Sequence, residues 1–531
     1  MRAIAKIKIM YKLFLKNLIN ISSKPLYQII AIFLLALLLR VFRLGEYPVG
    51  FHVDEVKVGW NALSILKTFR DDQGNFLPLY YNTFGDYRPT GIFYLSIPAI
   101  AIFGNTIFAV RITSALIGAL TIIPLYLLSK ELFKKDSVGV YSALILAVSP
   151  WHIETSRATS EVVISGFFIV LIIYLSIINK KIILNLFAII LSYFLYHSSR
   201  LLLPIYLTTL FLTKNINKYL LFFSMSLTII LSFGSASRAR LNQVSIFNSE
   251  NVKYELKRSN EPKLFVYTRS IIKEYGKYFS SDFLIGESAK PYRYLTLGVG
   301  LLNYIDLFLL IIGLYLLVKN GNYLLPILLF ISPLASILTI EDSPNLHRSF
   351  YMILFIAIIE GYAISQIRRK KEILTILFIS LIYFIYAYFL KSNLHIPYQK
   401  NLYIDSPTYR NVGNIELIEI INKYKNDYKN IYITNFPDNL YSWYAFLNNQ
   451  NPKQFNSISL VSNTNERRFE NIYFTDTKCP SDYVTESKSL VIDSGECPTE
   501  TKIKDGMKGE IITKIKRSDD SVVYSIFATA N

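Results

Sequence analysis

Residues 162–178 read VVISGFFIVLIIYLSII, a run without a single charged side chain. A helix that crosses a lipid bilayer needs about 20 mostly apolar residues, with a range of roughly 17–25. This stretch therefore predicts a membrane-spanning helix. Comparable apolar runs alternate with short polar connectors from residue 25 to about residue 390, which predicts an α-helical polytopic membrane protein.

The composition of the chain changes near residue 390. Of its 531 residues, 52% are hydrophobic and 18% are charged, whereas about 25% are charged in an average soluble domain. Beyond residue 390 the polar content becomes ordinary. We therefore expect a transmembrane domain over residues 1–390, with long outer loops at 43–89 and 235–300, followed by a small soluble α/β domain over residues 391–531.

The apolar runs predict about 11 to 13 transmembrane helices. The candidate spans are 25–42, 90–106, 108–130, 138–153, 162–178, 182–196, 202–213, 218–234, 301–318, 323–340, 349–366 and 373–390. The number of crossings within 90–153 stays open. Lys134 and Lys135 favour a cytoplasmic loop, which conflicts with counting 90–106 and 108–130 as two full spans.

Basic residues beside the apolar runs predict the orientation. The net charge of +18 lies in short loops rather than in a Lys/Arg-rich domain, so no nucleic-acid partner is expected. The basic N-terminal segment and the basic cluster 368–371 belong in the cytoplasm by the positive-inside rule. No small-residue cleavage site follows the first apolar run, so we expect a retained anchor. The sequence thus predicts a plasma-membrane protein with a cytoplasmic N-terminus and an extracytoplasmic C-terminal domain.

Cys479 and Cys497 are the two cysteines of the chain, and both fall in the segment predicted to be external. Disulfides persist in oxidising compartments. We therefore expect a disulfide between them, and two free surface thiols are the alternative.

The first outer loop contains YPVGFHVDEVKVGWNALSIL, residues 47–66. Asp54 and Glu55 stand at the start of a predicted amphipathic helix that would lie in the membrane interface, with Asp54 as its N-cap. One interpretation makes Asp54 a cap and Glu55 a solvated neighbour. The other makes a carboxylate at the membrane surface a general base.

Basic side chains recur at the predicted outer ends of apolar runs, against the topological default. Arg88 precedes Pro89 and the next run, where a guanidinium can bind a phosphate in a bidentate manner or can snorkel to the interface. Three further clusters of ionisable residues follow. The first contains His152, Glu154, Arg157 and Glu161, the second contains His197 and Arg200, and the third contains Glu341, Asp342, His347 and Arg348. Ionisable groups near membrane depth indicate function, here a site for an anionic lipid head group. Helix-to-helix hydrogen bonding is the alternative.

Other chemistries have no support in the sequence. It contains no Walker loop, no Rossmann glycine pattern and no Ser nucleophile elbow. No two of its five histidines stand at the spacing of helical metal sites. We therefore expect no required cofactor, and a divalent metal is not indicated.

Together these residues resemble the GT-C superfamily of membrane glycosyltransferases, in particular the glycosyltransferase family 39-like group of protein O-mannosyltransferases and lipid A aminoarabinose transferases. The resemblance covers about residues 25–365. The matching elements are Asp54-Glu55 in a large outer loop, Arg88-Pro89 at its end, Arg-x-x-Ser-Ala-Leu-x-Gly-Ala-Leu from Arg111 to Leu120, Ser-Arg-x-x-x-Glu from Ser156 to Glu161, and His347-Arg348.

The resemblance implies an inverting transfer of a sugar from a polyprenyl-phosphate donor to a lipid, glycan or protein acceptor on the outer membrane face. Asp54 would be the general base, and Glu55 would orient the acceptor or assist. The candidates for binding the donor phosphate are Arg88, Arg200, His347 and Arg348, and those with an acceptor or structural role are His52, Trp60, Arg157 and Glu161. Cations that stabilise a leaving phosphate make a nucleotide unnecessary.

The chain departs from the family pattern near Arg88. Aminoarabinose transferases usually carry Lys at this place, and the His-Pro-Pro element of O-mannosyltransferases is here Arg-Pro-Thr at 88–90. No repeat resembles the extra carbohydrate-binding domain of O-mannosyltransferases. The sequence therefore leaves the sugar and the acceptor undefined, and a transporter or flippase of lipid-linked sugars is the competing function, although no internal repeat is evident.

The soluble domain is expected to mix helices and strands. NIELIEIINKY (414–424) has helical periodicity, and YSWYAFLNN (441–449) is a second helix candidate. NIYITN (430–435), NIYFTD (471–476) and SLVIDS (489–494) are predicted strands. This domain could bind acceptor glycan through its aromatic residues or simply cap the membrane domain.

Overall fold

The computed structural model describes residues 24–83, 86–234, 245–258, 261–296, 298–392, 409–434, 440–456, 466–517 and 520–530. The basic N-terminal residues Arg2, Lys6, Lys8, Lys12 and Lys16, on which the predicted orientation partly rests, lie outside these ranges. The chain divides into two compact units. Unit 1 consists of Met1–Phe42, Tyr80–Pro89 and Ser114–Ile385, and unit 2 of Arg43–Leu79, Thr90–Thr113 and Tyr386–Asn531.

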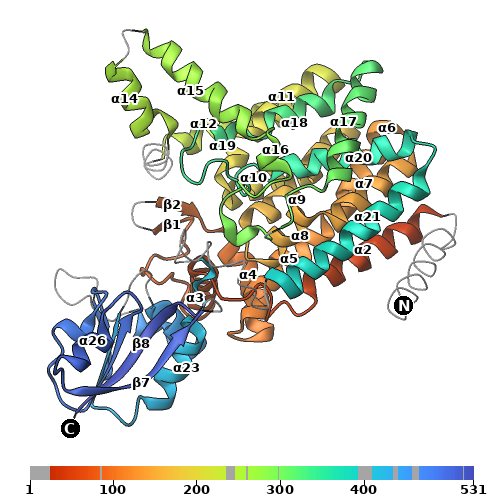
Figure 1. Ribbon diagram of the computed structural model, residues 1–531. Helices are drawn as coiled ribbons and strands as arrows, with labels where there is room; N and C mark the ends of the chain where they lie inside the picture. The colour runs from red at the N-terminus through yellow and green to blue at the C-terminus, as the bar shows by residue number, and fades with distance from the viewer. Residues whose placement is uncertain are drawn as a thin grey trace, which may run out of the picture. The chain divides into compact units, whose positions relative to one another are not determined.

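Unit 1 is a bundle of mostly apolar helices (Figure 1). Its helices are α2 (Pro25–Val41), α6 (Ile122–Phe133), α7 (Asp136–Val148), α8 (Pro150–Arg157), α9 (Glu161–Ile178), α10 (Ile182–Leu195), α11 (His197–Lys214), α12 (Lys218–Ser232), α14 (Glu250–Arg258), α15 (Lys263–Lys277), α16 (Ser281–Leu284), α17 (Tyr304–Lys319), α18 (Leu324–Ile331), α19 (Leu334–Ile337), α20 (Tyr351–Gln366) and α21 (Lys370–Ile385). Two short strands, β1 (Tyr80–Thr83) and β2 (Asp86–Pro89), form an antiparallel hairpin.

Helix α20 lies in the core of this bundle. All of its residues from Tyr351 to Ile364 are buried, as expected of a helix that is apolar on every side. It packs against α7 and α17, and an added Cβ at Gly361 would overlap Ser142 of α7. Small residues let helix backbones approach closely, which is the packing used between helices in membranes.

Among the residues that the structure describes, three helical runs are long and apolar enough to cross a membrane, Ile107–Phe133, Glu161–Ile178 and Lys370–Leu390. Seven shorter apolar helices accompany them in the described part of the chain, which confirms the predicted polytopic α-helical class. The ambiguous segment 90–153 contains a 13-residue helix α4 (Gly91–Phe103), the continuous 27-residue run Ile107–Phe133, and then α7. The two candidate spans at 90–106 and 108–130 are therefore unequal, because the second alone forms a helix of spanning length.

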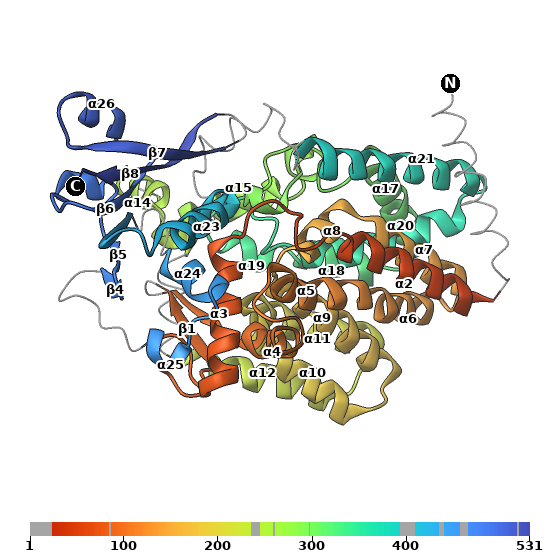
Figure 2. The same cartoon turned by 90° about the horizontal axis from the view of Figure 1, so that it is seen from below.

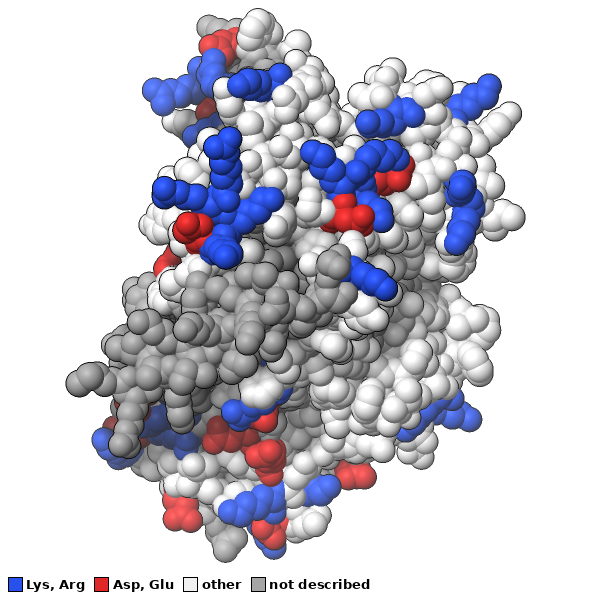
Figure 3. Space-filling model, turned by 90° about the vertical axis from the view of Figure 1, so that its right-hand side faces the viewer, with Lys and Arg blue, Asp and Glu red and all other residues white. Residues whose placement is uncertain are grey.

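The connections between consecutive helices of unit 1 carry basic residues at one end of the bundle. They are Lys24 before α2, Lys134 and Lys135 between α6 and α7, Lys180 and Lys181 between α9 and α10, Lys214 and Lys218 at the turn between α11 and α12, Lys319 at the end of α17, and residues 368–371 between α20 and α21. Figure 3 views the side of the molecule on which α6, α7 and α20 lie in Figure 1 and shows Lys and Arg side chains gathered there, with acids among them.

Unit 2 joins the loop segment 43–79 to the C-terminal domain. It contains α3 (Val53–Thr68), α4 and the start of α5 (Ile107–Leu120), and in the C-terminal domain α23 (Asn414–Tyr424), α24 (Tyr441–Leu447), α25 (Pro452–Phe455) and α26 (Thr499–Lys504). Helix α3 packs against α4, α24 and α25 (Figure 2).

A mixed six-stranded sheet forms the centre of the C-terminal domain, with strand order β4-β5-β3-β6-β8-β7. The strands are β3 (Asn430–Thr434), β4 (Arg467–Phe469), β5 (Ile472–Thr475), β6 (Ser489–Ser494), β7 (Gly509–Lys516) and β8 (Val522–Thr529). β3 is parallel to β5 and β6, and the remaining pairs are antiparallel. The predicted strands at 430–435, 471–476 and 489–494 and the predicted helices at 414–424 and 441–449 are confirmed.

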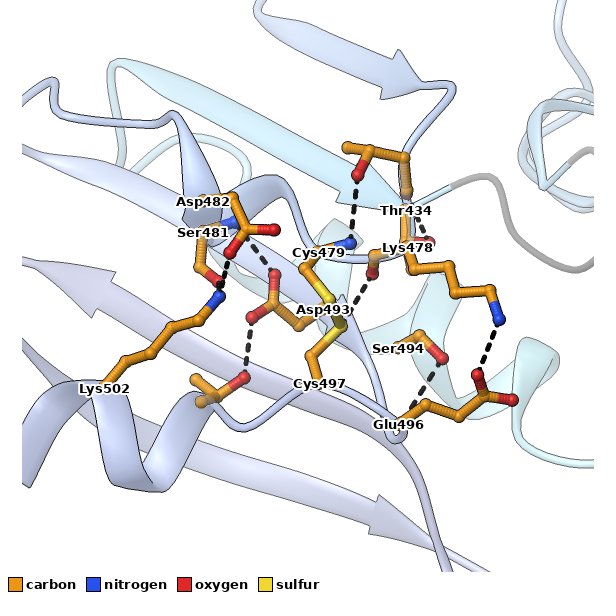
Figure 4. The surroundings of a disulfide bond; sticks show 12 residues. Thr434, Lys478, Cys479, Ser481, Asp482, Asp493, Ser494, Glu496, Cys497 and Lys502 are labelled. Carbon is orange, nitrogen blue, oxygen red and sulfur yellow. Dashed lines mark hydrogen bonds and ion pairs between the residues drawn. A yellow bond between two sulfur atoms is a disulfide. The ribbon is translucent and has the colours of Figure 1, made fainter.

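The expected disulfide between Cys479 and Cys497 is present (Figure 4). It ties the segment after β5 to the segment after β6 across an 18-residue separation. Asp493 reinforces this junction, because its carboxylate accepts hydrogen bonds from the Ser481 N–H at 3.0 Å and from the Thr499 hydroxyl at 2.6 Å (Figure 4).

Replacing both cysteines by serine is expected to destabilise this sheet by about 3 kcal/mol, since a loop of this length then regains its freedom in the unfolded chain. Hydrogen exchange of β5 and β6 in the full-length protein measures the effect. The unsubstituted protein treated with a reductant should show the same increase in exchange. Unchanged exchange in both samples would contradict a stabilising role for the bond.

Candidate active site

The start of α3 carries the acidic pair, and its cap differs from the prediction. The N-cap is His52, not Asp54: the His52 Nδ1 accepts a hydrogen bond from the Asp54 N–H at 3.1 Å. The Glu55 carboxylate in turn accepts from the His52 N–H at 3.2 Å, which completes a capping box. The prediction failed because an imidazole nitrogen can accept a hydrogen bond from a first-turn amide as a carboxylate does, so His52, two residues before Asp54, occupies the N-cap position.

Glu55 is held by a buried arginine within unit 2. Arg111 donates to both of its carboxylate oxygens, from Nε at 2.8 Å and from Nη2 at 2.9 Å. The same guanidinium donates to the carbonyl oxygens of Pro48 at 2.9 Å and Gly50 at 2.6 Å. Arg111 is fully buried and Glu55 nearly so, so this bidentate pair fixes the loop 44–50 against the first turn of α3.

Asp54 has a different environment from its neighbour. Its side chain is 29% exposed, and one of its oxygens lies 3.6 Å from the His52 Nδ1. Glu55 is enclosed by Arg111, so Asp54 is the member of the acidic pair that another molecule can reach. The two neighbouring carboxylates therefore differ in environment: that of Glu55 is buried in an ion pair, and that of Asp54 is partly exposed.

Helix α3 is a buried helix rather than an interfacial one. Every residue from Glu55 to Ile65 is buried, on all sides of the helix. The prediction rested on its spaced apolar residues, but α4, α24 and α25 cover the faces that such spacing leaves polar. Trp60 belongs to this packing: its indole N–H donates to Asn456 at 3.2 Å and its ring meets Phe455 edge-on. Within unit 2, His52 thus caps α3 and Trp60 packs between helices, while an acceptor role for either stays a prediction.

In unit 1 the hairpin β1–β2 meets the start of α11. The imidazole Nε2 of His197 lies 2.8 Å from the carbonyl oxygen of Tyr87, the residue before Arg88. Arg200, one turn further along α11, lies over the ring of Tyr80 at 5.2 Å and donates to the Tyr193 carbonyl at 3.0 Å. The hairpin and the helix therefore bring together Arg88, His197 and Arg200.

The protonation of His197 follows from these neighbours. His197 precedes the apolar part of α11, and burial, reinforced by the cations Arg200 and Arg88, lowers the pKa of His197 to about 4. Its ring is consequently neutral at physiological pH, and the two arginines carry the positive charge of this cluster.

His347 extends the same cluster. Its Nε2 lies 2.9 Å from the Ser160 hydroxyl and its Nδ1 lies 3.4 Å from the hydroxyl of Tyr196, the neighbour of His197. Its ring stacks on Tyr294 with centroids 4.9 Å apart. A continuous row of contacts thus runs from Ser160 through His347 and the Tyr196-His197 pair to the β-hairpin.

Arg348 is engaged in its own loop. It pairs with Glu341 and donates from Nη1 to the Thr339 hydroxyl at 2.7 Å. Its backbone N–H donates to Asn345 at 2.8 Å. The side chain is largely buried, and these bonds shape the segment 338–350 that carries His347.

Two further buried arginines bind helix ends. Arg157 donates to the carbonyl oxygens of Leu39 at 2.9 Å and Phe42 at 2.8 Å, at the end of α2. Arg40 donates to Leu146 and Ala147 at 3.1 Å each, at the end of α7, and lies 2.8 Å from the His152 Nδ1. Arg157 thus makes the helix-to-helix contact of the structural alternative, and its acceptor role stays a prediction. Glu161 opens α9 and is half-buried.

The predicted site residues fall in both units. Unit 2 holds Asp54 and Glu55, and unit 1 holds Arg88, Arg200, His347 and Arg348. Sequence reasoning missed the role of Arg111, although a lone cation inside an apolar run was a usable signal. It also missed Tyr196, Tyr294 and Ser160, which no sequence pattern distinguishes in a chain so rich in these residue types. Among the described residues, no group of three or more His, Cys, Asp or Glu side chains could hold a metal ion.

Known proteins give the fold its context. Residues 87–231 match the family model of dolichyl-phosphate-mannose-protein mannosyltransferases, and no curated protein sequence matches the chain. The crystal structure of ArnT from Cupriavidus metallidurans in the apo state is similar over 94% of this chain and 97% of that one, at 11% identity and a TM-score of 0.54. The same protein bound to undecaprenyl phosphate gives a TM-score of 0.50 at 11% identity, over 94% of this chain and 96% of that one.

An oligosaccharyltransferase is also similar. The enzyme from Archaeoglobus fulgidus matches over 80% of this chain at 13% identity with a TM-score of 0.45. The chain spans 61% of that protein's length. The similarity of fold to ArnT thus extends over almost the whole of both chains.

Whether the buried ion pair of Glu55 and Arg111 stabilises the protein can be tested by mutation. Glu55→Gln should lower the stability of the protein by about 3 kcal/mol, because it leaves the Arg111 guanidinium buried without its counter-charge. The measurement is the thermal unfolding midpoint of the full-length protein in detergent. The matched control is Glu46→Gln, which removes the same charge from the exposed Arg43–Glu46 pair of the same loop and should leave the midpoint where it was. Equal midpoints for both variants would contradict the assignment.

Proposed function

Since the chain has the fold of the GT-C membrane glycosyltransferases, we propose that it transfers a sugar from a polyprenyl-phosphate-linked donor to an acceptor hydroxyl. The match of residues 87–231 to dolichyl-phosphate-mannose-protein mannosyltransferases supports a lipid-linked donor, as does the similarity to a protein that binds undecaprenyl phosphate. The sugar is a hexose or pentose, and the acceptor is a lipid, a glycan or a protein.

The accessibility of Asp54 beside an immobilised Glu55 is the observation that carries the mechanism. A general base must reach the hydroxyl proton of the acceptor. Asp54 meets this condition, because it projects from the first turn of a rigid buried helix with part of its carboxylate exposed. The acceptor oxygen, relieved of its proton by Asp54, attacks the anomeric carbon from the face opposite the phosphate. The sugar is therefore transferred with inversion.

Arg88 and Arg200 are the cations we assign to the donor phosphate. The bond between sugar and phosphate oxygen breaks as the new bond forms, and charge grows on the leaving phosphate. Fixed positive groups that face this charge lower the barrier. The neutral ring of His197, which is close enough to both arginines to feel their charge, adds no third positive charge to the cluster. His347, stacked on Tyr294 and joined to Tyr196, borders this cluster.

We further propose that the sugar is transferred on the outer face of the plasma membrane. The basic connections of unit 1 gather at one bundle end, which the positive-inside rule assigns to the cytoplasm. The cluster of His197, Arg200 and His347 lies at the other ends of the same helices. A disulfide in the C-terminal domain fits an oxidising compartment, so the chain starts in the cytoplasm and its C-terminal domain lies outside.

Asp54→Asn should lower the transfer rate at least 100-fold, because the amide cannot accept the acceptor proton. Purified full-length protein is given labelled polyprenyl-phosphate sugars and acceptor extract, and labelled product is counted. Asp282→Asn, a change at another first-turn aspartate, in α16, is the matched control and should keep full activity. Full activity of the Asp54→Asn variant would show that Asp54 is not the general base. Movement of the lipid-linked sugar across vesicles without any transfer would instead identify a flippase.

Arg88→Gln should reduce kcat/KM for the lipid-linked donor about 100-fold, since a donor to the growing phosphate charge is lost. Arg88→Lys should recover part of this loss, because it restores the charge but not the bidentate geometry. The KM for the acceptor should stay unchanged in both variants. If only the KM for the acceptor changed, Arg88 would contact the acceptor, and its assignment to the donor phosphate would be wrong.

A further inference from the structure

The helical hairpin α14–α15 exposes large apolar side chains, which water does not favour. It joins the end of α12 to the segment before α17 and extends beyond α12 and α19, away from the remaining helices of unit 1 (Figure 1). Val252 of α14 and Val266 of α15 are buried. Three large apolar side chains of α15 are not: Leu264 is 73% exposed, Phe265 64% and Ile272 66%.

These apolar side chains share a face of α15 with cations. Leu264, Thr268 and Ile272 are spaced by four residues and so lie in one row along the helix. Phe265, Arg269 and Lys273 form the adjacent row, and both rows are exposed. Apolar side chains beside Lys and Arg are the composition of a helix that lies at the boundary between acyl chains and head groups.

The hairpin is also basic. Residues 250–277 contain seven Lys and Arg against four Glu. Three of the glutamates pair within the hairpin, with Lys253, Arg269 and Lys277. Among the described residues, Lys257, Arg258, Lys263 and Lys273 form no ion pair. These four cations are available to an anionic surface, where each strengthens attachment.

A groove between the two helices adds a binding place. Its volume is about 580 Å³, and it is lined by Asn251, Tyr254, Glu255, Arg258, Arg269 and Lys273. Three of these six residues are cations. Arg258 and Lys273 reach it from different helices, so an anionic head group that enters the groove meets positive charge from both sides.

The anchoring of the hairpin agrees with a position at the membrane surface. At its far end, the Tyr275 hydroxyl donates to the Phe330 carbonyl of α18 at 2.9 Å, and Phe279 packs on Phe330 at 5.0 Å. Phe330 ends an apolar helix of the bundle, and the end of α12 exposes Ile229, Ile230 and Phe233. The C-terminal end of the hairpin therefore lies beside apolar side chains that suit lipid.

From these observations we propose that α14–α15 is a membrane-docking element that lies on the bilayer surface and binds anionic phospholipid head groups. Leu264, Phe265 and Ile272 enter the acyl boundary, and Arg258 and Lys273 contact the head-group phosphate. This surface is separate from the sugar-transfer cluster and does not depend on that proposed function.

Fluorescence quenching in nanodiscs tests the proposal. An environment-sensitive dye is attached to Thr268→Cys in the full-length protein, whose own cysteines are closed in a disulfide. The nanodiscs contain phosphatidylcholine with a doxyl quencher near the head group, with or without phosphatidylglycerol. We expect most of the fluorescence to be lost in the mixed nanodiscs, and much less of it in phosphatidylcholine alone. A dye on Ile230→Cys, at the exposed end of α12, confirms that the quencher reaches a lipid-facing site.

A charge-reversed variant separates lipid binding from mere proximity. Arg258→Glu/Lys273→Glu should remove the additional quenching caused by phosphatidylglycerol. Lys504→Glu/Lys508→Glu, which makes the same charge change in the C-terminal domain, should keep it. Absence of quenching at position 268 while position 230 is quenched would overturn the docking proposal. Full retention of the phosphatidylglycerol effect in the reversed variant would overturn the assignment to anionic head groups.

Discussion

A bundle of this kind depends on the satisfaction of backbone carbonyls where its helices end. Within hydrocarbon no water is available to bond them, so protein groups must do so. Buried arginines perform this task here. Arg157 binds the end of α2, Arg40 binds the end of α7, and Arg111 binds the carbonyls of the loop that follows α2. Each guanidinium offers several hydrogen-bond donors in a fixed plane, so one side chain can donate to two or three backbone carbonyl oxygens.

These arginines determine where the accessible chemistry lies. A buried cation requires a counter-charge or many carbonyl dipoles. Arg111 obtains its counter-charge from Glu55, and this pair fixes the first turn of α3 from which Asp54 projects. The structural carboxylate and the accessible one are adjacent in sequence because the first holds the backbone that presents the second. In unit 1, Arg348 is similarly committed to Glu341 and shapes the loop of His347.

Two types of amphipathic helix behave differently in this chain. Helix α3 has the spaced apolar residues of an interfacial helix but is covered by helices from distant parts of unit 2. The α14–α15 hairpin has less apolar content, yet its large apolar side chains stay exposed beside basic ones. Periodicity alone does not distinguish them, because it records which residues are apolar and not what covers them.

The sequence by itself determined the membrane class, the three strands β3, β5 and β6 and the two helices α23 and α24 of the C-terminal domain, and the Cys479–Cys497 pairing. Apolar run length and residue period depend on local chemistry and on the bilayer, so they can be read from the chain. Tertiary structure decided the cap of α3, the enclosure of Trp60, and which arginines hold carbonyls. Arg111 and Glu55 are 56 residues apart, and Ser160 and His347 are 187 apart. Contacts across such separations arise when helices pack, and no local pattern in the sequence encodes them.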